Sequence, residues 1–172
     1  MRYFIILSFL IFSCTSDQIK ESNIESKAQD ILSQMTLDEK VGQMAQINLT
    51  VIAKGPTKWS SSFPLEIDPK KTRKALVDFK VGSVLNTINN TAQKPETWFK
   101  TISEIQKYSM DSTRMGIPII YGIDAIHGTT YTDGATMFPQ QITTAASWNE
   151  ENAYNMALVC AYETRASGIP WN

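Results

Sequence analysis

The stretch GIPIIYGIDAIHG, residues 116–128, decides how the rest of the chain is interpreted. Its run of branched apolar residues predicts a buried strand, which is typical of a parallel sheet covered by helices on both faces. A carboxylate, Asp124, and a glycine-containing loop follow that run directly. Ligands of such sheets bind beyond the carboxyl ends of the strands, so Asp124 occupies the position of a substrate-facing group.

Predicted helices and strands alternate on either side of this stretch. Helical spacing of apolar residues and cap signals predict helices over about residues 24–35, 37–45, 68–79, 95–115 and 148–167. Strands are expected over 81–86, over 117–123 and from 169 onward. This alternation predicts right-handed βαβ units and a parallel sheet. The connection over residues 124–146 is long, and long loops in compact domains usually carry function.

Short polar signals mark where three of these helices begin. Thr36 and Glu39 fit a capping box, in which the threonine caps the helix and the glutamate reaches back. Ser147 and Glu150 fit a second capping box. Asp68 stands before a proline, which is typical of an N-cap followed by the first helical residue.

The composition is that of a folded domain. Of 172 residues, 42% are hydrophobic and 19% are charged, which is enough apolar material for a real core. The net charge is −1, from 16 basic and 17 acidic residues. A nucleic-acid-binding protein usually shows a basic excess, so we expect no nucleic-acid partner.

The first 14 residues are typical of an export signal. Arg2 supplies a positive charge, and residues 3–12 form an apolar run that is too short to span a bilayer, which needs about 20 residues. Cys14 follows, and the segment resembles a bacterial lipoprotein signal in which this cysteine receives the lipid anchor. Ordinary secretion, with Cys14 incidental, is the alternative. We therefore divide the chain into this signal, a flexible polar tether over 15–23 and a globular part over 24–172, and expect an exported periplasmic or cell-envelope lipoprotein of a bacterium.

Two side chains in the stretch suggest chemistry. Asp124 either accepts hydrogen bonds from ligand hydroxyls, as a carboxylate does with a sugar, or caps the backbone of a nearby loop. Its position alone does not separate these two roles. His127 could pair with Asp124 in a metal site or a catalytic dyad, but zinc takes three or four protein ligands, so a loop-ordering histidine is favoured. No nucleophile-elbow, phosphate-loop or dinucleotide motif is present in the sequence.

The remaining candidates have structural explanations. Cys160 lies in a helical pattern and is expected to be a small buried apolar residue rather than half of a disulfide. Four aromatic residues surround the long loop, and sugar rings stack on such side chains, but core packing is the default for each: Tyr121, Tyr131, Phe138 and Trp148.

Several ordered segments together resemble glycoside hydrolase family 3. MTLDEKVGQM (35–44) is similar to that family's opening helix, and VGSVLN (81–86) to its first barrel strand. RMGIPIIYGIDAIHG (114–128) resembles the second strand and the loop after it. Residues 135–172 resemble the next helix and the start of the third strand. The form YGIDAIHG is similar to the β-glucosidase and exo-β-glucanase branch, and the DQEGG-type segment of the β-N-acetylhexosaminidase branch is not present.

The resemblance implies a (β/α)8 barrel, of which the chain holds the first few βα units, since a full barrel takes about 250 residues. It implies a retaining hydrolase of terminal non-reducing β-D-glucosyl residues, acting on β-glucoside or β-glucan oligosaccharides without metal or organic cofactor. Asp124 matches the aspartate that binds hydroxyls of the terminal sugar. The family's nucleophile and acid/base have no counterpart here, so no catalytic residue is assigned and the chain alone is expected to be inactive.

Two other interpretations compete with this one. The first is a membrane-anchored sugar-binding lipoprotein without catalysis. The second is a doubly wound α/β domain of unrelated function, which the helices before the first expected strand argue against. Because Asn172 falls where another strand begins, we expect these residues to belong to a longer protein.

Overall fold

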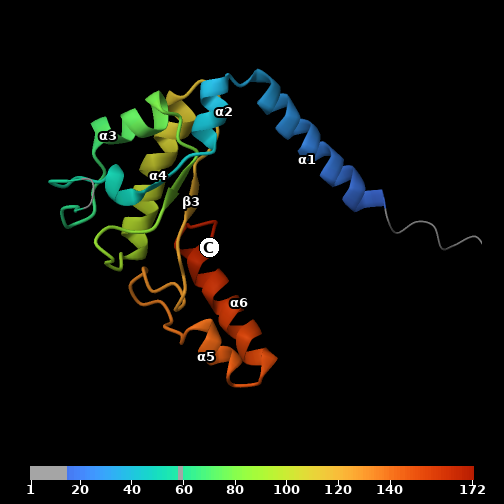
Figure 1. Ribbon diagram of the computed structural model, residues 1–172, viewed down its shortest axis with the longest axis vertical. Helices are drawn as coiled ribbons and strands as arrows, with labels where there is room; N and C mark the ends of the chain where they lie inside the picture. Colours follow the sequence, from blue (N-terminus) through green and yellow to red (C-terminus); the bar gives the residue numbers. More distant parts are fainter. Residues whose placement is uncertain (1–14, 58–59) are drawn as a thin grey trace, which may run out of the picture. The chain divides into compact units, whose positions relative to one another are not determined.

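The computed structural model describes residues 15–57 and 60–172 (Figure 1). The predicted export signal and its lipidation residue Cys14 lie outside the described residues. The chain divides into two units, residues 1–36 and 37–172, and each is described by itself. No helix in the described ranges combines the length and apolar character that crossing a membrane requires.

The first unit contains one long helix, α1 (Thr15–Gln34). The prediction of a flexible tether over residues 15–23 is therefore wrong, because this segment is the first part of α1. Its polar composition suggested flexibility, yet the helix contains neither glycine nor proline, the two residues that disfavour a helix most. Ile24 and Ile31, on the side of the helix predicted to be apolar, are exposed.

The second unit alternates short strands and helices. Its elements are α2 (Leu37–Gln43), β1 (Gln46–Asn48), the 3-10 turn η1 (Leu49–Val51), α3 (Pro69–Arg73), the π-helical turn η2 (Lys74–Asp78), β2 (Ser83–Leu85), α4 (Pro95–Ser112), β3 (Ile120–Gly122), α5 (Gln141–Ala145) and α6 (Glu150–Ala166). Helices α5 and α6 lie side by side (Figure 1). The alternating order predicted from the sequence is confirmed, with one strand and one α-helix that were not predicted: strand β1, and the short helix α5 inside the segment 124–146 that was expected to be a loop.

The strands form a parallel sheet in the order β1-β2-β3. Asn48 is opposite Leu85, and Leu85 is opposite Gly122, so the carboxyl ends of the strands share one edge. Trp171 forms a parallel bridge with Gly122, so the end of the chain lies beside β3 where a fourth strand of the sheet would pair. The segment expected as the first strand, 81–86, is therefore the second. Strand β1 escaped prediction because it has three residues, two of them polar, and follows a helix almost directly.

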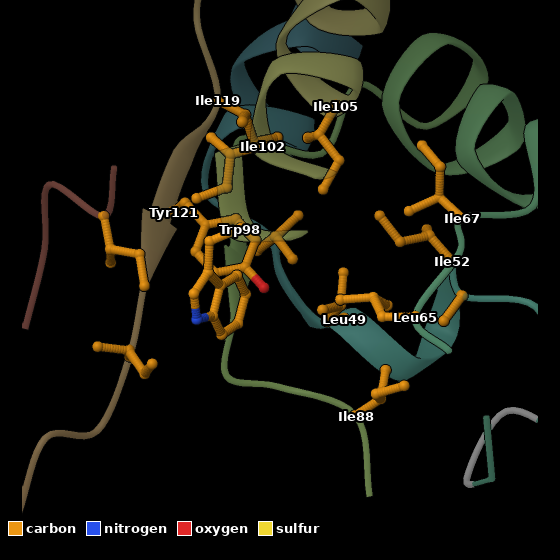
Figure 2. Close-up of a cluster of buried hydrophobic side chains, with 14 of the residues drawn as sticks. Leu49, Ile52, Leu65, Ile67, Ile88, Trp98, Ile102, Ile105, Ile119 and Tyr121 are labelled. Atoms are coloured by element: carbon orange, nitrogen blue, oxygen red, sulfur yellow. The ribbon is translucent and has the colours of Figure 1, made fainter. Parts of the chain in front are cut away.

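The core lies between this sheet and the helices that cover it. Trp98 and Tyr121 are fully buried and meet edge to face, with ring centroids 5.7 Å apart. Ile102 and Ile105 of α4 are buried with Trp98, which confirms the predicted inner face of that helix. Figure 2 shows Trp98 beside Tyr121 in this cluster. The burial of these side chains fixes how β3 lies against α4.

The cap signals are confirmed in part. The Asp68 carboxylate accepts hydrogen bonds from the backbone N–H groups of Lys70 and Lys71 at 2.9 and 3.1 Å, as predicted for an N-cap. Helix α6 is capped by Asn149 and not by Ser147, because Trp148 has a positive φ of 53° that breaks the helix there.

Glu39, the second member of the first predicted capping box, pairs with a residue far along the chain. Its carboxylate accepts a hydrogen bond from Arg114 Nε at 3.0 Å and a second one from Nη2. The Glu39 side chain is nearly buried, and its hydrogen bonds raise the pKa of Arg114 above the ordinary value. This ion pair ties the start of α2 to the turn that precedes β3.

Candidate functional site

Polar side chains end the parallel strands at one edge of the sheet. Asn48 is the last residue of β1, Asn86 follows β2 directly, and Asp124 comes two residues after β3. Asn172 follows Trp171 at the fourth position. The Asp124 residue is exposed at this edge. The structure thus places Asp124 where the sequence predicted it, at the end of the sheet where α/β proteins bind ligands.

Asn86 holds Asp124 at two points. Asn86 Nδ2 donates a hydrogen bond to Asp124 Oδ2 at 2.9 Å, and the Asp124 backbone N–H donates to Asn86 Oδ1 at 3.2 Å. One carboxamide therefore engages both the side chain and the backbone of one residue. Sequence reasoning missed Asn86, and its only signal was a polar residue directly after a predicted strand.

Asn86 is itself fixed by the strand beside it. Its backbone N–H donates to the Gly122 carbonyl at 2.9 Å, and its carbonyl accepts from the Tyr121 hydroxyl at 2.6 Å. Burial raises the pKa of Tyr121 well above the ordinary value, so this phenol stays protonated and remains a donor. The turn at Asn86 is left-handed, with φ of 64°, a conformation that asparagine tolerates better than most residues.

A second asparagine holds the next residue. Asn172 Oδ1 accepts a hydrogen bond from the Ala125 backbone N–H at 2.8 Å, and its Nδ2 lies 3.6 Å from Cys160 Sγ. Cys160 is buried and has no disulfide, as predicted for a small core residue. The backbone N–H groups of Asp124 and Ala125 are therefore bound by two asparagine side chains: Asn86, after β2, binds the first, and Asn172, at the end of the chain, binds the second.

His127 orders the loop that follows. Its ring atom Nδ1 lies 3.2 Å from the Phe138 carbonyl oxygen, and the Phe138 backbone N–H donates to the His127 carbonyl at 2.8 Å. With Nδ1 protonated, these two contacts close the segment between the two residues. This supports the loop-ordering role predicted for His127. Within the described ranges, no three His, Cys, Asp or Glu side chains gather in a way that would hold a metal ion.

Buried hydroxyl groups anchor the rest of the long loop to α6. The Thr129 and Thr164 hydroxyls lie 2.7 Å apart, and those of Thr132 and Ser167 lie 2.8 Å apart. From α4, Trp98 Nε1 donates to the Tyr131 carbonyl at 3.1 Å. The loop after β3 is therefore fixed by the core.

The aromatic residues around this loop separate into two groups. Tyr121 is fully buried, and Tyr131 packs partly buried against the core. Trp148 is 96% exposed, so the expectation of core packing is wrong for this residue. Trp148 lies in the turn between α5 and α6 and has a positive φ of 53°.

A largely apolar hollow of about 490 Å³ lies beside the site. Its walls come from α5, from α6, including Cys160, from the last residues of the chain, including Asn172, and from Ala125 in the loop after β3. Asp124 is not part of its lining. None of the described residues that line the hollow is an aspartate or a glutamate, so the exposed edge at Asp124 is the better candidate for binding sugar hydroxyls through a charged acceptor.

The sequence matches a known family over most of its length. The model of the "Glycosyl hydrolase family 3 N terminal domain" matches residues 36–172. The chain belongs to glycosyl hydrolase family 3. The resemblance found in the sequence is thereby confirmed, and with it the expected fold class, the first βα units of a barrel-type domain.

Relatives of known activity are similar along most of the chain. This chain is 29% identical to the lysosomal beta glucosidase of Dictyostelium discoideum, over 90% of the residues of this chain. It is also 29% identical to the periplasmic beta-glucosidase of Salmonella typhimurium, over 81% of its own residues. The chain covers only 20% and 15% of these two proteins.

Solved structures agree with this assignment. An exo-1,3/1,4-beta-glucanase from a Pseudoalteromonas species superposes with a TM-score of 0.65 at 29% identity, over 86% of this chain and 22% of the glucanase. A variant beta-glucosidase from Listeria innocua in complex with laminaribiose gives a TM-score of 0.56 at 28% identity, over 84% and 18%. The chain therefore spans about a fifth of the length of the proteins it resembles.

Proposed function

We propose that this chain forms the sugar-binding first part of a retaining β-glucosidase-type hydrolase. The whole enzyme would hydrolyse terminal non-reducing β-D-glucosyl residues of oligosaccharides. Family membership and the names of the relatives support the class of reaction. The single observation that carries the role of this chain is the Asp124 carboxylate, exposed at the carboxyl edge of the sheet and held by Asn86.

The contacts of Asp124 suit a group that binds hydroxyls. Within the described part of the chain, hydrogen bonds reach Asp124 at Oδ2 and at the backbone N–H. The other carboxylate oxygen, Oδ1, is left to accept from a sugar hydroxyl. Hydrogen bonds to an ionised acceptor are about twice as strong as neutral ones, and hydroxyl contacts in glycosidases strengthen in the transition state. Asp124 would therefore accelerate the reaction as well as hold the substrate.

The bond-breaking groups are assigned elsewhere in this proposal. A retaining glycosidase needs two carboxyl groups about 5–5.5 Å apart, one as nucleophile and one as acid/base. The family resemblance matches Asp124 to neither of them. We assign both to polypeptide outside these 172 residues, and no metal or organic cofactor to the reaction.

The names of the relatives also support a proposed class of substrate and a proposed location. The complex of the Listeria enzyme with laminaribiose favours β-glucan oligosaccharides as ligands. The periplasmic relative favours an exported protein, and the N-terminal sequence favours a lipid anchor at Cys14. Mass spectrometry of the mature N-terminus tests the anchor, and an unmodified Cys14 would exclude it.

Replacing Asp124 by alanine tests the proposed role. In the longest polypeptide that the gene encodes, Asp124→Ala should lower kcat/KM for 4-nitrophenyl β-D-glucoside by about a hundred-fold or more, from the loss of a charge-assisted hydrogen bond in the transition state. Asp133→Ala is the matched control, because Asp133 is an exposed carboxylate of the same loop. Near-normal kinetics of Asp124→Ala would remove this residue from the site. Glucoside binding without any turnover by the unmodified protein would favour the sugar-binding alternative.

A further inference from the structure

We propose that Asn86 is a positioning residue that fixes the orientation in which the Asp124 carboxylate faces the sugar. This inference rests on the proposed function, because it concerns the same site. Asn86 lies directly after β2, 38 positions before Asp124 in the sequence and outside the stretch 116–128. Its side chain contacts the carboxylate of Asp124.

The two contacts between Asn86 and Asp124 restrict the carboxylate. The bond from the Asp124 backbone N–H to Asn86 Oδ1 holds the Asn86 carboxamide in place, and turning the Asp124 carboxylate away from it breaks the bond between Asn86 Nδ2 and Asp124 Oδ2. The carboxylate is therefore held in one orientation before a ligand arrives. Oriented groups that need no rearrangement stabilise a transition state more than mobile ones do.

The position of Asn86 is equally constrained. The left-handed turn at φ 64° directs its side chain toward the end of β3, and the Tyr121 hydroxyl and Gly122 carbonyl fix its backbone. Asparagine combines three properties that this place uses: tolerance of positive φ, one acceptor and one amide donor. Glycine would keep only the first of these, and aspartate would keep the first two.

These differences define two diagnostic variants. Asn86→Gly removes the carboxamide and leaves the turn unstrained. Asn86→Asp keeps the turn and an acceptor for the Asp124 N–H, but it replaces the donor by a negatively charged oxygen next to the carboxylate. A purely structural role predicts that Asn86→Asp resembles the wild type. A positioning role predicts that it loses at least as much kcat/KM as Asn86→Gly.

The experiment compares steady-state kinetics on 4-nitrophenyl β-D-glucoside in the longest polypeptide that the gene encodes. We expect kcat/KM to fall by about ten-fold or more in both variants, the size of one hydrogen bond to a charged group. Asn90→Gly is the control, because Asn90 is exposed and also has a positive φ, 51°, in the same loop. It should leave kcat/KM within about two-fold of the wild type.

A double-mutant cycle separates this inference from the proposed function. If Asn86 acts through Asp124, Asn86→Gly should have no further effect in an Asp124→Ala background. An equal loss in both backgrounds, or wild-type kcat/KM in Asn86→Asp, would overturn the positioning role while leaving Asp124 in the site. A silent Asp124→Ala variant would instead overturn the proposed function itself. Thermal melts of all variants identify any loss that arises from unfolding.

Discussion

Replacing Tyr121 by phenylalanine removes a single oxygen atom from the interior, beneath the candidate site. The Tyr121 side chain is fully buried, and its hydroxyl donates to the Asn86 carbonyl at 2.6 Å. The variant loses this hydrogen bond, whose net contribution is about 0.5–1.5 kcal/mol, and it also leaves a carbonyl without its donor. We therefore expect the free energy of unfolding to fall by about 1–2 kcal/mol. For a protein of this size, the melting temperature should fall by about 2–8 °C.

Urea unfolding followed by tryptophan fluorescence, with a thermal melt by circular dichroism, measures this change. The control is Tyr162→Phe, which deletes the same atom from a side chain that is 75% exposed, and it should stay within about 0.5 kcal/mol of the wild type. Equal stability of Tyr121→Phe and Tyr162→Phe would refute the reasoning. The Tyr121 hydroxyl would then contribute nothing to fixing the turn at Asn86.

Two further predictions concern the scaffold. A Cβ atom on Gly82 would lie 2.2 Å from the Gln43 carbonyl oxygen, so Gly82→Ala should lower the free energy of unfolding by about 1–3 kcal/mol or more. Gly134 has a φ of 83°, and no atom lies within 4 Å of a carbon added there. Gly134→Ala should therefore lower the free energy of unfolding by only about 1 kcal/mol in the same urea titration. The backbone N–H groups of Lys71 and Lys70 lower the pKa of Asp68 below its ordinary value of 3.8. The stabilisation by the Asp68 charge is therefore complete above the unfolded pKa of 3.8 and is lost as the pH falls through the lower folded pKa. The stability advantage of the wild type over Asp68→Asn should be constant near neutral pH and should shrink as the pH falls below about 4. An advantage that does not change there would contradict this.

The sequence predicted the features of the fold that depend on neighbouring residues alone, such as where a helix begins, where it ends and which of its faces is buried. The Asp68-Pro69 start, the inner face of α4 and the end of α6 could all be predicted from the sequence. At the end of α6, Gly168 has a φ of 79°, and the Ile169 N–H donates to the Thr164 carbonyl, as expected for a helix that ends on glycine. Each of these features depends on a few adjacent residues.

Features that depend on distant residues could not be predicted. The pairing of Asn86 with Asp124 requires the register between β2 and β3, which no pattern in either segment specifies. The Thr129–Thr164 contact likewise joins residues 35 positions apart. The sequence therefore predicted the location of the candidate site and one of its residues, but not the side chain that holds that residue.

The strand order in the sheet repeats the order of the strands in the sequence. Ile47 is opposite Val84, and Val84 is opposite Tyr121, so each strand pairs with the strand that lies 37 residues before it in the sequence. No pairing between these strands has to wait for a strand that lies later in the chain. The architecture is thus suited to folding unit by unit from the amino terminus, in the order in which an exported chain emerges from the membrane.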